Sequence, residues 1–336
     1  MHMSDALLSV AVGGTMTAVS TGAIGFSIKK IKKIEIDDKK IPMMGVMGAF
    51  IFAAQMINFI IPVTGSSGHI GGGILLAALL GPFPALITLA SVLLIQCLFF
   101  ADGGLLALGC NIFNMGVIPC LIAYPLIYKP ILKKGMTPKR ITIASVLAVI
   151  VGLQLGSFSV VLETIASGIT ELPFTAFVSL MQPIHLAIGA VEGTITAAVI
   201  CFIYNIRKEI LDSALKGSPM RNVSIRKVLV ILLVATIFIG GFLSIYASSN
   251  PDGLEWSIKG VTGTTELAAD SSVHSAADSL QDKTAILPDY NLKDKLQVDN
   301  VVGTSISGMV GALFTLTLAG LIGVIILIFK KKKHYR

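Results

Sequence analysis

Residues 70–100 read IGGGILLAALLGPFPALITLASVLLIQCLFF, a run of 31 residues without a charged side chain. A transmembrane helix needs about 20 mostly apolar residues, so this run is too long for one ordinary span. Gly81-Pro82-Phe83-Pro84 interrupts it, and two prolines at that spacing break a helix. The stretch predicts either one kinked crossing or a hairpin of one short and one ordinary helix.

Further apolar runs lie on both sides of this stretch. Only 13 % of the residues are charged and 54 % are hydrophobic, whereas soluble domains carry about 25 % charged residues. The sequence therefore predicts an all-α integral membrane protein, multi-pass and surrounded by lipid. The additional predicted spans are 6–28, 43–62, 104–127, 141–163, 182–206, 228–247 and 304–329.

The basic residues indicate the topology, because Lys and Arg concentrate in cytoplasmic loops. Residues 29–40, 129–140, 207–227 and 330–336 hold 22 of the 26 Lys and Arg, so all four segments should share one side. An even number of crossings must then separate the first two segments, which excludes a single kinked crossing at 70–100. We predict nine transmembrane helices, an outer N-terminus and a cytoplasmic C-terminus. A re-entrant 70–80 element paired with a re-entrant 84–100 element is the alternative.

Two modules are predicted. Lys216-Gly217-Ser218-Pro219 is a polar linker that separates a seven-helix module, residues 1–215, from a two-helix module, residues 222–336. The second module contains the predicted outer loop 248–303, which has nine acidic residues and four lysines. Its Ser, Thr and Asp content predicts a largely loose segment. We expect His274 in this loop and His334 in the basic tail to be solvated surface residues.

His2 follows the chain terminus directly. No Lys or Arg precedes the first apolar run, which argues against a cleaved signal peptide, and the bulky His2 disfavours removal of Met1. A free amine, the amide nitrogen of residue 2 and its imidazole can close on one ion in fused rings. Such planar nitrogen sets suit Ni²⁺ and Cu²⁺, and one position remains for another ligand.

Four other polar residues are candidates for the same site. His69 ends Gly65-Ser66-Ser67-Gly68-His69, in a predicted outer loop, and neutral imidazole is the commonest metal ligand. His185 and Glu192 lie about two helical turns apart, and ionisable residues inside a membrane are functional candidates. We expect them, with Asn58, to support the ligands rather than to bind the ion directly.

Some features bear on partners and on excluded functions. Gly14, Ala18 and Gly22 form a stripe of small residues that predicts contact with another helix. The chain has no G-x-x-x-x-G-K-[ST] motif for ATP hydrolysis, no C-x-x-C and no H-E-x-x-H. Its four cysteines lie within apolar runs as packing residues. We find no catalytic constellation, and we expect no organic cofactor and no nucleic-acid partner.

Several motifs together resemble the CbiM/NikM family over about residues 1–210. Pro251-Asp252-Gly253-Leu254-Glu255 resembles the signature of the small companion component, CbiN or NikN, which suggests a natural fusion. The motifs of the first part are Met1-His2-Met3-Ser4-Asp5-Ala6-Leu7, Gly65-Ser66-Ser67-Gly68-His69, Leu79-Leu80-Gly81-Pro82, Ala101-Asp102-Gly103-Gly104, Gly109-Cys110-Asn111, and Gln182-Pro183-Ile184-His185 with Gly189, Glu192 and Gly193.

The resemblance implies the substrate-capture component of an energy-coupling factor importer in the cell membrane. It implies Ni²⁺ or Co²⁺ as the transported substrate, bound by the amine of Met1, the amide and imidazole of His2, and the imidazole of His69. It also implies a transmembrane coupling subunit (CbiQ/NikQ-like) and a cytoplasmic ATPase (CbiO/NikO-like) as partners. Planar nitrogen ligation slightly favours nickel. The alternative function is an autonomous secondary transporter or channel for divalent transition metals.

Overall fold

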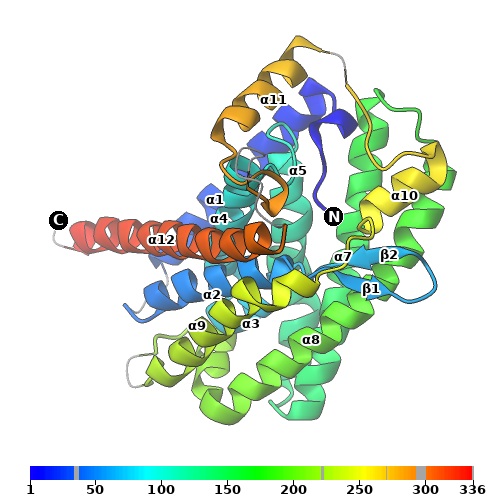
Figure 1. Ribbon diagram of the computed structural model, residues 1–336. Coiled ribbons are helices and arrows are strands. Elements are labelled where there is room, and N and C mark those ends of the chain that lie inside the picture. The colour runs from blue at the N-terminus through cyan, green and yellow to red at the C-terminus, as the bar shows by residue number, and fades with distance from the viewer. Residues whose placement is uncertain (34–37, 221–222, 270, 293–299, 335–336) are drawn as a thin grey trace.

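The computed structural model describes residues 1–33, 38–220, 223–269, 271–292 and 300–334, and these residues are mostly helical. Figure 1 shows a helical bundle with α10, α11 and the N-terminus gathered at one end.

The elements are η1 Asp5–Leu7, α1 Val10–Lys33, α2 Lys40–Gln55, β1 Phe59–Ile61, β2 Ser66–Gly68, α3 Gly73–Leu80, α4 Pro82–Phe100, α5 Leu108–Ile112, the π-helix η2 Phe113–Tyr128, α6 Lys129–Lys133, α7 Pro138–Ser167, α8 Phe174–Lys216, α9 Arg226–Gly241, η3 Leu243–Tyr246, α10 Gly253–Thr262, α11 Ser272–Thr284, η4 Pro288–Tyr290 and α12 Asn300–His334.

The break predicted at Gly81 is present. α3 ends at Leu80 and α4 begins at Pro82, where the missing N–H of proline costs nothing in the first helical turn. Gly81 has a φ of 89°, a conformation open mainly to glycine, so the chain turns sharply on this one residue. α3 has only 8 residues, or about 12 Å of helix against about 30 Å of hydrocarbon.

The residues before α3 are not helical, and their backbone is bonded inside the protein. The carbonyl of Gly71 accepts from the Gln55 amide at 3.0 Å, and the N–H of Gly72 donates to Glu192 at 3.0 Å. At its other end, α3 reaches the carbonyl of Ala214, near the C-terminal end of α8. Non-helical backbone inside a membrane protein requires such internal partners, and the bonds to Gln55 and Glu192 supply them for Gly71 and Gly72.

Within the described residues, six helices are long and apolar enough to cross a membrane: α1, α4, the continuous α5–η2–α6 segment, α7, α8 and α12. α2 is apolar but shorter, with 16 residues. The fold is an all-α membrane protein, as predicted. The total of nine crossings and the orientation of the chain stay predictions.

The observed helices differ from the predicted spans at their ends, and two of these differences bear on the site. The span 43–62 is helical only to Gln55, and β1 then pairs antiparallel with β2, Phe59 opposite Gly68. The first helix begins at Val10 rather than at residue 6. Met3, Leu7 and Leu8 precede it and are fully buried. The N-terminal segment is therefore inserted into the protein, and helix formation starts after it.

The second module packs against the first. α9 and α12 both contact α2, and α10 contacts α8. Gly308 of α12 lies against the backbone of Gly240 in α9, so the two helices touch where neither has a side chain. The division into modules at 215–222 stays a prediction. Gly14, Ala18 and Gly22 on α1 are exposed, so no described part of this chain covers the stripe that is predicted to contact a partner.

The expectation of a loose outer loop at 248–303 is wrong for its described residues. These residues include α10, α11 and η4, and both α10 and α11 begin at side-chain caps, Asp252 and Ser271. His274 is also not a surface residue, since only 4 % of it is exposed. Its Nε2 faces the carbonyls of Leu8 and Asp5 at 2.9 and 3.2 Å. The loop folds because it covers the buried N-terminal segment. The side chain of His334 lies outside the described residues.

Candidate metal-binding site

The N-terminal segment is held by backbone-directed bonds on both sides of Met3. Asn111 of α5 accepts from the Met3 N–H at 2.8 Å and donates to the Met3 carbonyl at 3.1 Å. The same carbonyl accepts from Gly104, and the Asp5 carboxylate accepts from Ala107 at 2.9 Å. These bonds fix the register of the first residues, so Met1 and His2 have defined places.

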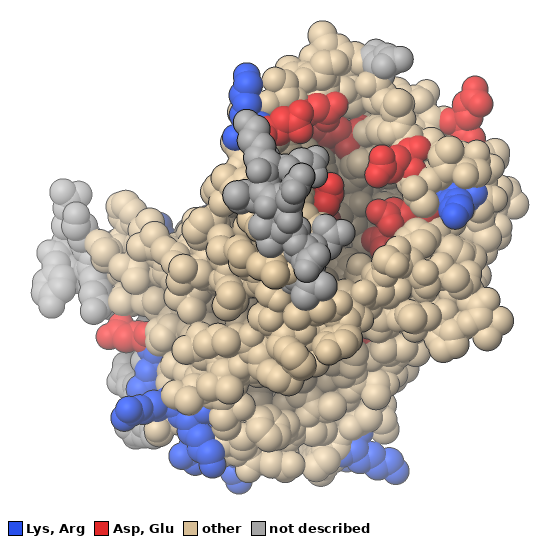
Figure 2. Space-filling view, in the orientation of Figure 1, with Lys and Arg blue, Asp and Glu red and all other residues tan. Residues whose placement is uncertain are grey.

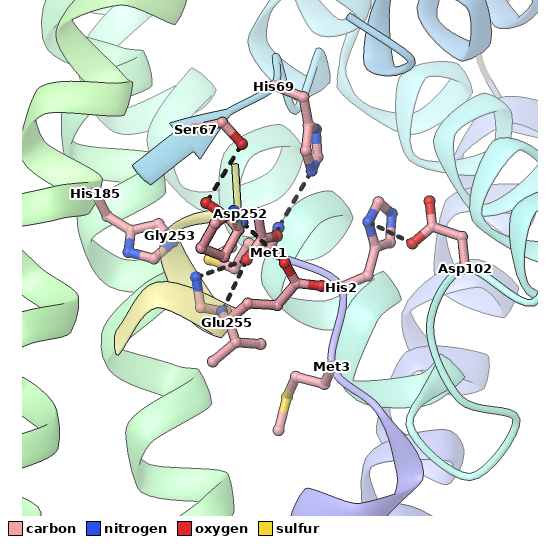
Figure 3. A network of polar contacts seen from close by, with 12 residues as sticks. Met1, His2, Met3, Ser67, His69, Asp102, His185, Asp252, Gly253 and Glu255 are labelled. Carbon is pink, nitrogen blue, oxygen red and sulfur yellow. Dashed lines mark hydrogen bonds and ion pairs between the residues drawn. The ribbon is translucent and has the colours of Figure 1, made fainter. Parts of the chain in front are cut away.

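The amine of Met1 lies between a histidine and a carboxylate from distant parts of the chain. It is 3.2 Å from Nε2 of His69 and 2.5 Å from Oδ2 of Asp252 (Figure 3). Only 6 % of Met1 is exposed. In this form the amine is a charged hydrogen-bond donor, and Asp252 is its counter-ion.

His2 lies beside His69, with the ring centroids 5.2 Å apart and the rings nearly parallel. Its Nδ1 faces Asp102 at 3.1 Å, whereas its Nε2 is buried and has no hydrogen-bond partner among the described residues. Two of the four predicted donors, the amine and the His2 imidazole, are therefore each held by an acid. Binding of an ion would require both to turn from these acids.

The Pro251–Glu255 motif is docked on the loop that carries His69. The N–H of Ser67 donates to the Pro251 carbonyl at 2.8 Å, and its hydroxyl donates to the carbonyl of Asn250 at 2.7 Å. Oδ1 of Asp252 caps α10, which leaves Oδ2 for the amine of Met1. Glu255 completes the cap by accepting from the Asp252 N–H at 2.9 Å. The same short motif therefore caps the start of α10 and supplies the carboxylate that pairs with the Met1 amine.

Gly253 in the same motif allows a close approach. A side chain there would meet the His185 ring and Ile188 of α8 at about 3 Å or less. Because glycine has no Cβ, the first turn of α10 can lie directly on α8.

Burial and the amine together control protonation at the site. Burial lowers the pKa of His69 to about 3, helped by the adjacent amine charge. Burial also lowers the pKa of His2, although Asp102 opposes this. Burial alone would raise the pKa of Asp252, but the adjacent charged amine outweighs it and holds that pKa well below its usual range. Both imidazoles are therefore neutral near pH 7, the form that binds metals.

The donor positions suit a small divalent ion. Two nitrogens at right angles, each about 2.0–2.1 Å from an ion, are about 2.9 Å apart. The measured 3.2 Å between the amine and His69 is close to this value. No group of three or more His, Cys, Asp and Glu that could hold a metal occurs within the described residues. A site at this place needs the backbone donors of Met1 and His2.

The three candidate supporting residues are only partly brought together. Glu192 bonds the backbone at Gly72, beside His69. His185 points Nδ1 at the carbonyl of Met181, 2.8 Å away, and its buried Nε2 lies beside Gly253 without a hydrogen-bond partner in the described part of the chain. Both line a small cavity of about 40 Å³ with Met1 and His69. Asn58 lies at the wider cavity described below, and its carbonyl accepts from Ser248 at 2.8 Å.

A cavity of about 930 Å³ opens beside His2 and His69. Figure 2 shows Asp and Glu gathered around a hollow in the upper part of the molecule, while most Lys and Arg lie at the lower end. No Lys or Arg is among the described residues that line the cavity. Its acids are Asp5, Asp102, Asp252, Glu255, Glu266, Asp278 and Asp289.

The sequence pattern predicts Met1, His2 and His69 as neighbours but does not indicate the two acids, Asp252 at the Met1 amine and Asp102 at His2. Asp252 was identified only as part of a signature, and Asp102 only as part of a motif. Their role depends on contacts across 251 and 100 residues of chain. A single acid in an outer loop carries no local pattern that would distinguish it.

Comparisons with known proteins show which family the chain resembles over most of its length. The family described as "Cobalt uptake substrate-specific transmembrane region" (CbiM) matches residues 2–210, and the PDGLE domain matches residues 226–327. A protein of Archaeoglobus fulgidus, named as a fused nickel transport protein NikMN, is 30 % identical over 95 % of this chain and 96 % of its own length. The cobalt transport protein CbiM of Geobacter sulfurreducens is 25 % identical over 72 % of each chain. A crystal structure titled as a transition metal transporter superposes with a TM-score of 0.54 at 29 % identity, covering 62 % of this chain and 94 % of that one.

Proposed function

Since this chain belongs to the CbiM family and carries a PDGLE domain in the same polypeptide, we propose that it captures Ni²⁺ or Co²⁺ and delivers the ion across the cell membrane. The ion would be held by the amine of Met1, the amide and imidazole of His2, and the imidazole of His69. The observation that carries the proposal is the 3.2 Å separation of the amine from Nε2 of His69, with His2 stacked alongside.

The acid-lined cavity supports capture from the extracytoplasmic side. Clefts of one charge raise the local concentration of the opposite ion, so the carboxylates around this hollow favour entry of a divalent cation. Most of the visible Lys and Arg lie at the opposite end of the molecule, which supports a cytoplasmic position for that end because basic residues concentrate in cytoplasmic loops. The ion would enter beside α10 and α11 and reach the amine last.

We further propose that transport uses an energy-coupling factor mechanism. The chain lacks a nucleotide-binding motif, so ATP hydrolysis would be supplied by a cytoplasmic ATPase through a transmembrane coupling subunit. The exposed stripe of Gly14, Ala18 and Gly22 on α1 is a surface to which such a subunit could pack.

Uptake of radioactive Ni²⁺ into lipid vesicles tests this function. We expect uptake by the chain reconstituted with the coupling subunit and ATPase when ATP is present, and none by the chain alone. A variant carrying both His2→Ala and His69→Ala is the matched control and should be inactive in the complete system. Steady uptake by the chain alone, driven by an ion gradient, would instead identify an autonomous secondary carrier.

The proposed ligands predict a characteristic pH dependence. Both the amine and the His2 amide must lose a proton on binding, so the affinity for Ni²⁺ should fall as the pH falls, by about two powers of ten per pH unit. The pKa values of His2 and His69 are both lowered, His69 to about 3. Protonation of the two imidazoles should therefore not add to the change of Ni²⁺ affinity with pH between about pH 7.5 and 6. Equilibrium titrations with Ni²⁺ across this range would measure it, and a pH-independent affinity would exclude amide ligation.

A further inference from the structure

A histidine that binds a metal through one ring nitrogen donates its other N–H to a neighbouring acceptor. His69 has such an acceptor, because its Nδ1 faces the carbonyl of Ile70 at 3.1 Å, which leaves Nε2 for an ion. The proposed chelate uses Nδ1 of His2, since Nε2 lies on the far side of the ring from the His2 amide nitrogen. In the chelate, Nε2 of His2 must therefore carry the ring proton, and it needs an acceptor.

Asp102 is not this acceptor. Its Oδ1 faces Nδ1 of His2 at 3.1 Å, so the contact belongs to the metal-free protein and breaks when an ion takes Nδ1. A carboxylate can only accept, so Nδ1 of a neutral His2 carries the proton while it faces Asp102. Nε2 is then an acceptor itself, buried and without a hydrogen-bond partner in the part of the chain that the structure describes.

Gln96 of α4 places a free acceptor beside this ring. Its side chain lies within hydrogen-bonding reach of His2, and its backbone carbonyl accepts from the N–H of Asp102 at 3.1 Å. Gln96 is fully buried, and its Oε1 has no hydrogen-bond partner among the described residues. Buried polar atoms without partners are costly, so Oε1 of Gln96 and Nε2 of His2 would both gain from a proton placed between them.

The orientation of the Gln96 amide is fixed by two neighbours. Its Nε2 donates to Oε1 of Gln55 at 2.9 Å and to the hydroxyl of Tyr290 at 3.3 Å. Gln55 uses its own amide nitrogen on the carbonyl of Gly71, and the only hydroxyl proton of Tyr290 goes to Asp102. The reverse orientation of Gln96 would set its oxygen against two acceptors. Oε1 is therefore the end of Gln96 that remains for His2.

From these contacts we propose that Gln96 is a positioning residue for the metal site, whose Oε1 accepts from the Nε2–H of His2 and so leaves Nδ1 without a proton for the ion. The inference rests on the proposed function, because it takes His2 as a ligand. Asp102 and Gln96 favour opposite tautomers of one ring, Asp102 without metal and Gln96 with it. Because Gln55 and Tyr290 hold Gln96 independently of His2, its oxygen keeps its place when the ring turns from Asp102.

Equilibrium Ni²⁺ binding to the purified full chain tests the effect on the ligand. Gln96→Met keeps the length of the side chain and removes the acceptor, so it should weaken binding by about 10- to 100-fold, as for other outer partners of a ligand histidine. Gln154→Met is the matched control and should bind normally. Gln154 also bonds between helices, to the carbonyl of Gln182 at 2.8 Å, but it is not among the described residues that line either cavity. Unchanged binding by Gln96→Met, or an equal loss in Gln154→Met, would overturn the inference.

The position of the His2 proton separates positioning from a purely structural role, since Gln96→Met also loses the bonds to Gln55 and Tyr290. Nitrogen NMR of the metal-free chain, isotopically labelled at histidine, distinguishes a protonated ring nitrogen from a bare one, and His2→Ala identifies the His2 signals. In Asp102→Ala we expect the proton to move from Nδ1 to Nε2 and to exchange slowly with water. Adding Gln96→Met should make this exchange faster.

A purely structural role of Gln96 would lower the melting temperature of the metal-free variants and leave this exchange unchanged. A proton that stays on Nδ1 in Asp102→Ala, or exchange that is equally fast with and without Gln96, would contradict the inference and leave the chelate intact. Normal Ni²⁺ binding by His2→Ala is the separate result that would overturn the proposed function, and this inference with it.

Discussion

Two residues, Gly-Ser, placed ahead of Met1 should weaken Ni²⁺ binding by more than about 100-fold. Loss of an outer partner of a metal ligand alone costs about 10- to 100-fold, and this change removes the amine ligand itself. The amine of Met1 is also enclosed between His69 and Asp252, so added residues would displace one of them. Isothermal titration of the purified chain would measure the change, beside His2→Ala and His69→Ala.

The length of the extension matters. One added residue would place the histidine third, where an amine, two amides and an imidazole can again surround a planar ion. Two residues avoid this new chelate. The matched control carries Gly-Ser after Arg336 and should bind normally. Undiminished binding by the extended chain would show that the amine is not a ligand, and the site would then have to be sought around His69, His185 and Glu192.

Replacing Asp252 should give the largest loss of stability in the metal-free protein. Asp252 pairs with the amine of Met1, and the pair is nearly buried, with 5 % and 16 % of the two side chains exposed. Removing one partner of a buried ion pair costs about 3–5 kcal/mol. Asp252→Asn removes the charge but keeps a good helix cap, whereas Asp252→Ala removes both and should cost about 1 kcal/mol more. Melting temperatures in detergent would rank the two variants.

The pH dependence of this loss has a definite sign. The pKa of Asp252 is lowered in the folded protein by the amine, which outweighs burial. Its contribution to stability is therefore fully present above the unfolded pKa of about 3.9 and disappears as the pH falls toward the folded value. Below about pH 4 the difference between the unaltered chain and Asp252→Asn should shrink. Asp212→Asn, at an exposed pair with Lys216, is the control and should change little at any pH. Equal melting temperatures for Asp252→Asn and the unaltered chain near pH 7 would contradict the proposed contact.

Local chemistry was enough to predict the helices and the break between two of them. Gly81 and Pro82 end one helix and start the next because a positive φ and a missing N–H are properties of single residues. The apolar runs predicted membrane helices because burial in lipid is favoured residue by residue. Predicted boundaries failed where the chain leaves the helix for tertiary reasons. α2 ends early, at Gln55, and the side chain of Gln55 donates a hydrogen bond to the carbonyl of Gly71, outside any helix.

The candidate ligands could also be identified from sequence, since His2 and the chain terminus are adjacent and chelation by them is local. The residues that surround these ligands could not be identified from the sequence. The composition of 248–303 indicated a loose loop, yet α10 and α11 form there, and His274 bonds carbonyls at Asp5 and Leu8. Composition shows how much apolar surface a segment can bury by itself. It does not show whether another segment of the chain offers a surface on which the segment can pack.

The sequence by itself determined that this protein is a helical membrane protein and placed an amine, an amide and an imidazole together at its N-terminus, because hydrophobicity, helix breaking and the spacing of these donors depend on neighbouring residues. The tertiary structure alone decided which acids face these donors. Asp252 reaches the amine of Met1 across 251 residues, and Tyr290 reaches Asp102 across 188. Those contacts exist because α10 packs on α8 and segment 281–290 packs on α4, and packing between distant segments leaves no periodic trace in the chain.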